Sequence, residues 1–196
     1  RTAGCDPVTF QPCSDKALAS LKVYVDSFRQ IYPINQGRAP NAAVATGRYQ
    51  EDVYYGGQVS NLSLCSYPIR ILIDFRSPKP WYLTTAAVAE QLYDALIVWS
   101  SEKSLTITPT SLPFFRQFLP SAKTGTYKSS SSTYKTLIPA IKAFADGFIR
   151  VVAEYTPADG ALSEQYHRNN GTQTSAKHLT WSYASILTAD AARKGL

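Results

Sequence analysis

The amino-acid sequence predicts an all-α fold. In five segments, apolar side chains recur at steps of three and four residues, which is the spacing of one face of a helix. The loops between these segments are long, polar and rich in aromatic and charged residues, and loops of this kind often carry function. Only the segment from Ser66 to Arg76 alternates between apolar and mostly polar residues, which is the periodicity of a strand.

Each helix is expected from its own apolar pattern and from the residues at its ends. The predicted helices cover Ser14 to Tyr32, Thr85 to Trp99, Phe114 to Leu119, Tyr134 to Tyr155 and about Ala176 to Arg193. Pro33 and Pro120 stop the first and third helices, and Thr84 or Thr85 is the expected N-cap of the second. Pro139 falls inside the fourth helix, where its missing N–H should kink the first turns.

The composition favours a single globular domain or a piece of a larger one. The chain has 196 residues, with 20 Lys+Arg and 14 Asp+Glu, so its net charge is +6. The basic residues are scattered, which argues against a nucleic-acid partner. No apolar run approaches the roughly 20 residues of a membrane span, so no membrane partner is expected. Because the chain begins at Arg1 and contains no methionine, we expect a processed or partial product.

The cysteines and the N-glycosylation sequons indicate the cellular compartment in which the chain folds. Cys5 and Cys13 flank a turn-rich stretch, and their spacing suits a small disulfide-closed loop, with two unlinked buried thiols as the alternative. A bridge would indicate secretion into an oxidising environment. The sequons at Asn61 and Asn170 agree with secretion, while Cys65 is the odd cysteine.

The two histidines give no sign of a metal centre. His167 and His178 have no cysteine or carboxylate at the spacing of a metal site. We therefore interpret them as surface or hydrogen-bonded side chains, and we expect neither a metal nor a cofactor.

Two loops concentrate the groups that could do chemistry. The loop from Gly47 to Gly57 holds a guanidinium, two carboxylates and three tyrosines. Sugar sites use such groups, because charged side chains bond several hydroxyls while aromatic faces pack against the apolar faces of the ring. A surface ion pair between Arg48 and Asp52, with packed tyrosines, is the alternative. The second loop contains Glu164, and a single glutamate in a loop is ordinarily only solvated.

Eight blocks of the sequence form a recognisable series: Gly4 to Ser14, Val44 to Tyr55, Pro80 to Leu83, Ala89 to Leu96, Thr124 to Tyr134, Phe144 to Phe148, Leu162 to Tyr166 and Leu179 to Ala184. Taken in order, these blocks resemble the C-terminal part of the catalytic domain of fungal glucoamylases, the inverting exo-glucosidases of glycoside hydrolase family 15. Each block alone is only weakly specific for the family, but eight blocks in the family's order are highly specific for it. The resemblance covers nearly the whole chain except Val59 to Lys79.

This resemblance implies an (α/α)6 barrel, of which the chain would supply a little under half, and it implies a role for each matched residue. Glu164 matches the general base, which activates the water that attacks the anomeric carbon. Arg48 would donate to hydroxyls of the non-reducing glucose, and Tyr54 and Trp81 look like walls of the next sugar subsite. The full set of implied substrate-binding residues is Arg48, Tyr49, Asp52, Tyr54, Trp81, Gln165, Tyr166 and Trp181.

The resemblance also implies what the chain lacks. Inverting hydrolysis needs a general acid as well as a base, and the family's acid lies upstream of the matched segment. We therefore expect a secreted, extracellular enzyme that acts on starch and maltooligosaccharides when complete, with little activity in this chain without the N-terminal half of the barrel. A non-catalytic carbohydrate-binding or scaffold remnant is the alternative. Cys5 and Cys13 match a family disulfide.

One segment interrupts the partial catalytic domain expected over residues 1–196. The family's motif runs almost directly from Tyr54 to Pro80, whereas here the insertion 59–79 intervenes. The insertion is interpreted either as translated intron sequence or as a genuine surface excursion. We expect no starch-binding module within residues 1–196.

Overall fold

The computed structural model describes residues 4–6, 8–54 and 77–196. The strand-like segment from Ser66 to Arg76, Cys65, the sequon at Asn61 and all of the insertion before residue 77 lie outside the described residues. The described elements, in chain order, are α1 (Asp15–Ser27), the 3-10 helix η1 (Pro33–Asn35), α3 (Tyr82–Glu102), β1 (Ser104–Ile107), α4 (Leu112–Arg116), β2 (Gly125–Lys128), α5 (Ser132–Glu154), β3 (Gln165–Tyr166), β4 (Gln173–Thr174) and α6 (Thr180–Lys194).

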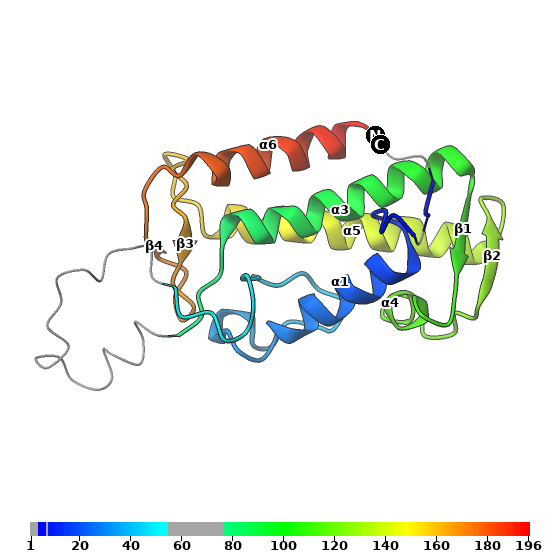
Figure 1. The fold of residues 1–196 in the computed structure, drawn as a ribbon, viewed down its shortest axis with the longest axis horizontal. Helices are drawn as coiled ribbons and strands as arrows, with labels where there is room; N and C mark the ends of the chain where they lie inside the picture. Colours follow the sequence, from blue (N-terminus) through cyan, green and yellow to red (C-terminus); the bar gives the residue numbers. More distant parts are fainter. Residues whose placement is uncertain (1–3, 7, 55–76) are drawn as a thin grey trace, which may run out of the picture.

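The fold is mainly helical, as predicted, and α3 is its central element. Helix α3 packs along both α5 and α6, while α1 runs beside it on another side (Figure 1). Eleven of its 21 residues are buried, among them Ala86, Leu92, Leu96 and Trp99, and they form a broad face that the neighbouring elements cover. None of the helices in the described part of the chain is long and apolar enough to cross a bilayer.

Two small antiparallel sheets close the two ends of the helices (Figure 1). At one end β1 pairs with β2, with Leu105 opposite Tyr127. At the other end β3 pairs with β4, with Gln165 opposite Thr174. The sequence pattern did not predict these strands, because an alternation of only two to four residues is too short to recognise.

The helix boundaries differ from the predicted ones at a few positions. Helix α1 starts as expected, with the Ser14 hydroxyl accepting a hydrogen bond from the Ala17 amide at 3.3 Å, but it ends at Ser27 rather than Tyr32. The prediction that Thr84 or Thr85 caps α3 is wrong, because the helix begins at Tyr82. The Thr85 hydroxyl instead donates to the Trp81 carbonyl at 2.9 Å.

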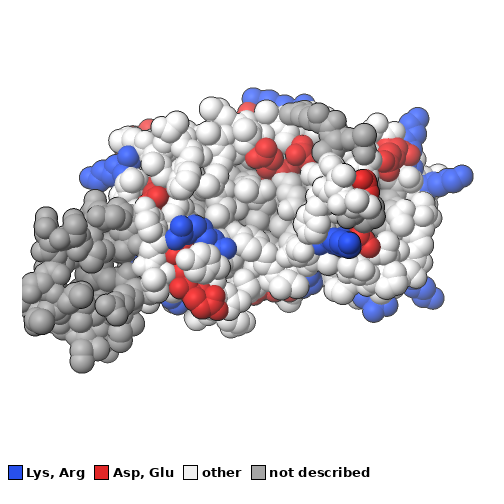
Figure 2. Space-filling model, viewed as in Figure 1, with Lys and Arg blue, Asp and Glu red and all other residues white. Residues whose placement is uncertain are grey.

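The cysteine and charge expectations can be compared directly with the structure. Cys5 and Cys13 form a disulfide, which confirms the predicted pairing and closes the loop before α1. Figure 2 shows Lys, Arg, Asp and Glu side chains interspersed over one face rather than gathered into a basic patch. Pro139 lies inside α5, as the sequence predicted.

Candidate active site

The predicted site residues meet at the end of the molecule where β3 and β4 lie (Figure 1). Glu164 immediately precedes β3, Trp81 immediately precedes α3, and Trp181 lies in the first turn of α6. Backbone hydrogen bonds join these segments: the Trp81 amide donates to the Thr46 carbonyl at 2.9 Å, and the Tyr166 amide donates to the Pro80 carbonyl at 3.1 Å. Main-chain bonds therefore tie the two loops of the candidate site together.

Gly47 sets the path of the loop that carries Arg48. A Cβ atom at Gly47 would lie 2.2 Å from the Tyr32 hydroxyl and 2.9 Å from the Lys79 carbonyl oxygen, closer than real Cβ contacts. The Tyr24 hydroxyl donates a hydrogen bond to the Gly47 carbonyl. Only glycine fits between these groups, so the turn into Arg48 depends on it.

Arg48 and Asp52 form a two-pronged ion pair. Arg48 Nε lies 2.8 Å from Asp52 Oδ2, and Arg48 Nη2 lies 2.6 Å from Asp52 Oδ1, which is the fork geometry that guanidinium groups favour. The Asp52 side chain is 1% exposed, whereas that of Arg48 is 36% exposed. Burial acts to raise the pKa of Asp52, but hydrogen bonds from Arg48 and from the Tyr54 amide, with the Arg48 charge, hold this pKa below its usual value.

Aromatic rings surround the Arg48 guanidinium. Its carbon lies 4.7 Å from the centre of the Tyr54 ring and 4.6 Å from that of Trp81, within the range of cation–π contacts. Tyr54 and Trp81 stack at 5.5 Å, and Trp81 and Trp181 lie 5.8 Å apart. Trp81 is only 1% exposed while Trp181 is 44% exposed. The surface open to a ligand is therefore formed mainly by the groups around Trp81, including the exposed ring of Tyr49.

Glu164 is a buried carboxylate held by two hydroxyl groups. Its exposure is 5%, its Oε1 accepts a long hydrogen bond from the Tyr54 hydroxyl at 3.4 Å, and its Oε2 accepts one from the Ser175 hydroxyl. Desolvation and the nearby Glu164 charge raise the pKa of Tyr54, so this hydroxyl keeps its proton and acts as the donor. The carboxylate is thus fixed in orientation and connected to the loop of Arg48.

Gln165 and Tyr166 lie behind Glu164 rather than beside the open surface. Gln165 is fully buried and donates from Nε2 to the Tyr54 carbonyl at 3.3 Å. Tyr166 is also fully buried, with its ring 4.8 Å from that of Tyr82 and 5.0 Å from that of Tyr155. Burial raises the pKa of Tyr166 far above its usual value, so this tyrosine stays neutral in the core. Both residues anchor the strand that follows Glu164.

Sequence reasoning missed Ser175, which contacts Glu164 although it lies eleven residues further along the chain. A serine in a polar loop carries no pattern that could single it out. The histidines are hydrogen-bonded, as interpreted: His178 Nδ1 lies 2.9 Å from the Tyr183 hydroxyl, and His167 Nδ1 accepts from the Asn169 amide at 3.3 Å. Among the residues that the structure describes, no three His, Cys, Asp or Glu side chains gather as a metal site.

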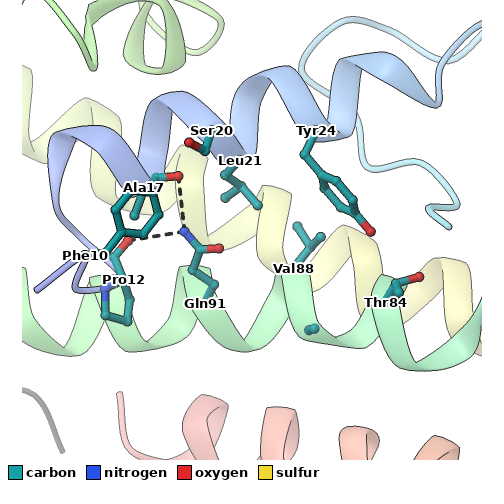
Figure 3. Close-up of a pocket in the computed structure, with 10 residues that line it drawn as sticks. Phe10, Pro12, Ala17, Ser20, Leu21, Tyr24, Thr84, Val88 and Gln91 are labelled. Carbon is teal, nitrogen blue, oxygen red and sulfur yellow. Dashed lines mark hydrogen bonds between the residues drawn. The ribbon is translucent and has the colours of Figure 1, made fainter. Parts of the chain in front are cut away.

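A separate apolar groove of about 510 Å³ lies between α1 and α3 (Figure 3). Leu21 and Val88 face it from the two helices, and no charged residue lines it. The Gln91 amide crosses one end, 3.4 Å from the Pro12 carbonyl oxygen. Its lining is mainly apolar, with hydroxyl groups from Ser20, Tyr24 and Thr84 but no charged group, so its chemistry suits an apolar partner. At its other end lies Tyr24, whose hydroxyl contacts Gly47.

Comparisons of this chain with family models, with curated proteins and with solved structures all match it to the same family. The family model described as glycosyl hydrolases family 15 matches residues 1–191. A glucoamylase of Neurospora crassa is 52% identical over 99% of this chain, and glucoamylase-1 of Schizophyllum commune is 55% identical over 98%. The solved structure of the family 15 glucoamylase from Hypocrea jecorina, 54% identical, superimposes over 98% of this chain with a TM-score of 0.86.

The matches also define how much of the relatives this chain represents. It spans 28% of the Neurospora protein, 30% of the Schizophyllum protein and 28% of the Hypocrea chain. The glucoamylase of Hormoconis resinae, at 40% identity, gives the same result, with 30% covered and a TM-score of 0.84. The described helices therefore match less than a third of these proteins, whose fold is the (α/α)6 toroid.

Proposed function

Because the chain belongs to glycosyl hydrolase family 15, we propose that it is part of a glucoamylase catalytic domain that releases glucose from the non-reducing ends of α-1,4-glucans. Starch and maltooligosaccharides are the substrates of the complete domain. The observation that carries the proposal is the buried carboxylate of Glu164, joined through Tyr54 to the guanidinium and aromatic groups around Arg48. The Cys5–Cys13 disulfide supports secretion, since such bridges persist in oxidising compartments.

In the proposed reaction Glu164 acts as the general base. Its carboxylate takes a proton from a water molecule as the water oxygen forms a bond to the anomeric carbon, and the glycosidic bond breaks on the opposite face of the sugar. The hydroxyls of Tyr54 and Ser175 would fix the carboxylate toward that water. Arg48 and the exposed rings of Tyr49, Tyr54 and Trp181 would hold the terminal glucose by forked hydrogen bonds and by stacking.

The leaving oxygen needs a proton from a second carboxyl group. In inverting enzymes this acid lies roughly 6.5 to 9.5 Å from the base, which leaves room for the water. Among the described residues of the loop opposite Glu164, Asp52 has both carboxylate oxygens engaged by Arg48, so it is poorly suited to be the acid. We therefore propose that the acid comes from the part of the domain that this chain does not span, and that residues 1–196 alone have little activity.

The groove between α1 and α3 supports this view of a partial domain. Helix α3 is flanked by α5 and α6 on one side, whereas its other flank, toward α1, carries the apolar groove (Figure 3). A helix from the N-terminal part of the barrel is the occupant that we propose for it. Leu21 and Val88 are already only 5% and 3% exposed, so such a helix would gain apolar burial mainly from Phe10, which also lines the groove and is 54% exposed. A large apolar side chain fully removed from water contributes about 1.5–3 kcal/mol.

A chimera tests the proposed catalytic role. Residues 1–196 replace the matching segment of the Hypocrea jecorina enzyme, and glucose release from maltose is measured for the chimera and for the isolated chain. We expect activity in the chimera and little in the chain alone. In the chimera Glu164→Gln should lower kcat by roughly 10²- to 10⁴-fold, whereas Glu102→Gln, an exposed glutamate at the end of α3, should leave it unchanged.

Three outcomes would contradict the proposal. Full activity of the Glu164→Gln chimera would remove Glu164 from the reaction. Turnover by the isolated chain close to that of an intact relative would mean that the acid lies within residues 1–196. A chimera that binds maltooligosaccharides but never hydrolyses them would favour a carbohydrate-binding remnant.

A further inference from the structure

The sequon at Asn170 has no part in the proposed catalytic site. Asn170, Gly171 and Thr172 are the last three residues of the loop 167–172, which joins β3 to β4 in the hairpin that follows Glu164 (Figure 1). Asn170 and Thr172 are both exposed. An N-linked oligosaccharide is bulky and hydrophilic, so only a sequon whose asparagine lies at the surface of the folded chain can carry one.

The hydrogen bonds of Asn170 leave its amide nitrogen available. The side-chain oxygen Oδ1 accepts from the Thr172 amide at 3.1 Å and from the Thr172 hydroxyl at 2.9 Å, so both of its lone pairs are used within the sequon. Among the described residues, no hydrogen bond is donated by Nδ2. A substituent on Nδ2 would therefore break no bond that the fold uses.

The loop is fixed by residues other than Asn170. Gly171 has a φ of +75°, and a Cβ there would lie 2.0 Å from Tyr155 Cδ1, so the turn packs its glycine against the helix end. The His167 amide donates to the Thr172 carbonyl at 2.7 Å, and the Ile34 amide donates to the Arg168 carbonyl at 3.2 Å. These contacts hold the inner side of the loop and leave Asn170 on its outer side.

We propose that Asn170 carries an N-linked oligosaccharide when the chain is made in a secretory compartment. Nδ2 of Asn170 forms a bond to C1 of the first sugar of a lipid-diphosphate-linked oligosaccharide. The bond from C1 to the diphosphate oxygen breaks, the lipid diphosphate leaves with that electron pair, and Nδ2 loses one proton. No oxidant or reductant is involved. The proposal rests on the secretion proposed above, but not on the role of Glu164.

The test uses the 196-residue chain behind a secretion signal in a eukaryotic host, with Asn61→Gln in every sample so that the second sequon is silent. Intact mass is measured before and after digestion with peptide N-glycosidase, on protein from the cells as well as from the medium. We expect one oligosaccharide per chain, removed by the enzyme. Tryptic peptides should place it on Asn170.

Matched variants separate the sequon from effects on folding. Thr172→Ser keeps the sequon and the hydroxyl and should keep the oligosaccharide, whereas Thr172→Ala and Asn170→Gln should abolish it. Asn169→Gln, at the exposed neighbouring asparagine, should have no effect, and Glu164→Gln should be modified like the parent chain. An unmodified parent chain, or a mass shift that persists in Asn170→Gln, would overturn the proposal.

Discussion

Replacing Arg48 with lysine should destabilise the fold more than replacing any comparable surface arginine, because the two prongs of the guanidinium cannot be reproduced by one ammonium group. Arg48 contacts both oxygens of Asp52, at 2.8 and 2.6 Å, and Asp52 is 1% exposed. Arg48→Lys keeps the positive charge but can satisfy only one of the two oxygens. The second Asp52 oxygen would then stay buried without its hydrogen bond from the guanidinium.

The size of the effect follows from these contacts. A hydrogen bond between charged groups contributes about 1.5–3 kcal/mol when it is shielded from water. Because the Arg48 side chain is 36% exposed, water competes with the bond, and we expect a value close to the lower end of that range or just below it. The free energy of unfolding should therefore fall by about 1–2 kcal/mol, which is roughly a 5- to 30-fold change in the ratio of folded to unfolded chain.

Urea unfolding followed by far-ultraviolet circular dichroism measures this loss. Arg193→Lys is the matched control, since Arg193 makes a single bond to Asp146 at 2.9 Å and its side chain is 47% exposed, so its loss should stay within about 0.5 kcal/mol. A double-mutant cycle with Asp52→Asn should give a coupling energy of about 1 kcal/mol or more. Equal losses in the two lysine variants, or additive effects in the cycle, would refute the reasoning.

Acid should remove the stability that Asp52 provides. The pKa of Asp52 is lowered in the folded chain, so this stability is present above the ordinary carboxyl pKa near 3.8 and is lost as the pH falls toward the folded pKa. In Asp52→Asn, the free energy of unfolding should therefore depend less on pH between pH 5 and 3 than it does in the parent chain. Parallel curves would contradict this. Gly171→Ala should lower the free energy of unfolding by about 1–3 kcal/mol more than Gly37→Ala does. Both glycines have positive φ, but only a Cβ at position 171 would meet the Tyr155 ring. Equal urea midpoints for the two variants would contradict this prediction. In the active chimera, Ser175→Ala should lower kcat about three- to tenfold with little change in KM, and an unchanged kcat would mean that this hydroxyl does not orient the base.

The helices could be predicted from the sequence because each buries a regular apolar stripe. Leu18, Leu21 and Val25 of α1 are buried as their spacing indicates. The helix ends were predicted less well. Thr85 looked like an N-cap, but tertiary contacts decide its role: its hydroxyl bonds to the Trp81 carbonyl and lies 3.2 Å from the Tyr166 hydroxyl. Sequence alone does not reveal such a contact.

The site could be predicted only as far as its groups have distinctive chemistry. The ion pair of Arg48 and Asp52, considered first as a surface alternative to a sugar site, is present, with its carboxylate buried. The resemblance pointed to Glu164, and the structure places that carboxylate within reach of Tyr54. Ser175 could not be predicted, because its contact depends on a hairpin whose strands are two residues each.

Two tryptophans lie close together at the candidate site, so the intrinsic fluorescence of the protein should report on ligand binding there. Of its three tryptophans, Trp81 and Trp181 have ring centres 5.8 Å apart beside Arg48, whereas Trp99 is enclosed in the core. A sugar that covers the exposed face of Trp181 would displace water from that indole and shift its emission toward the blue, while Trp99 supplies a constant background. Ligand occupancy could then be followed by intrinsic fluorescence in variants that cannot turn over.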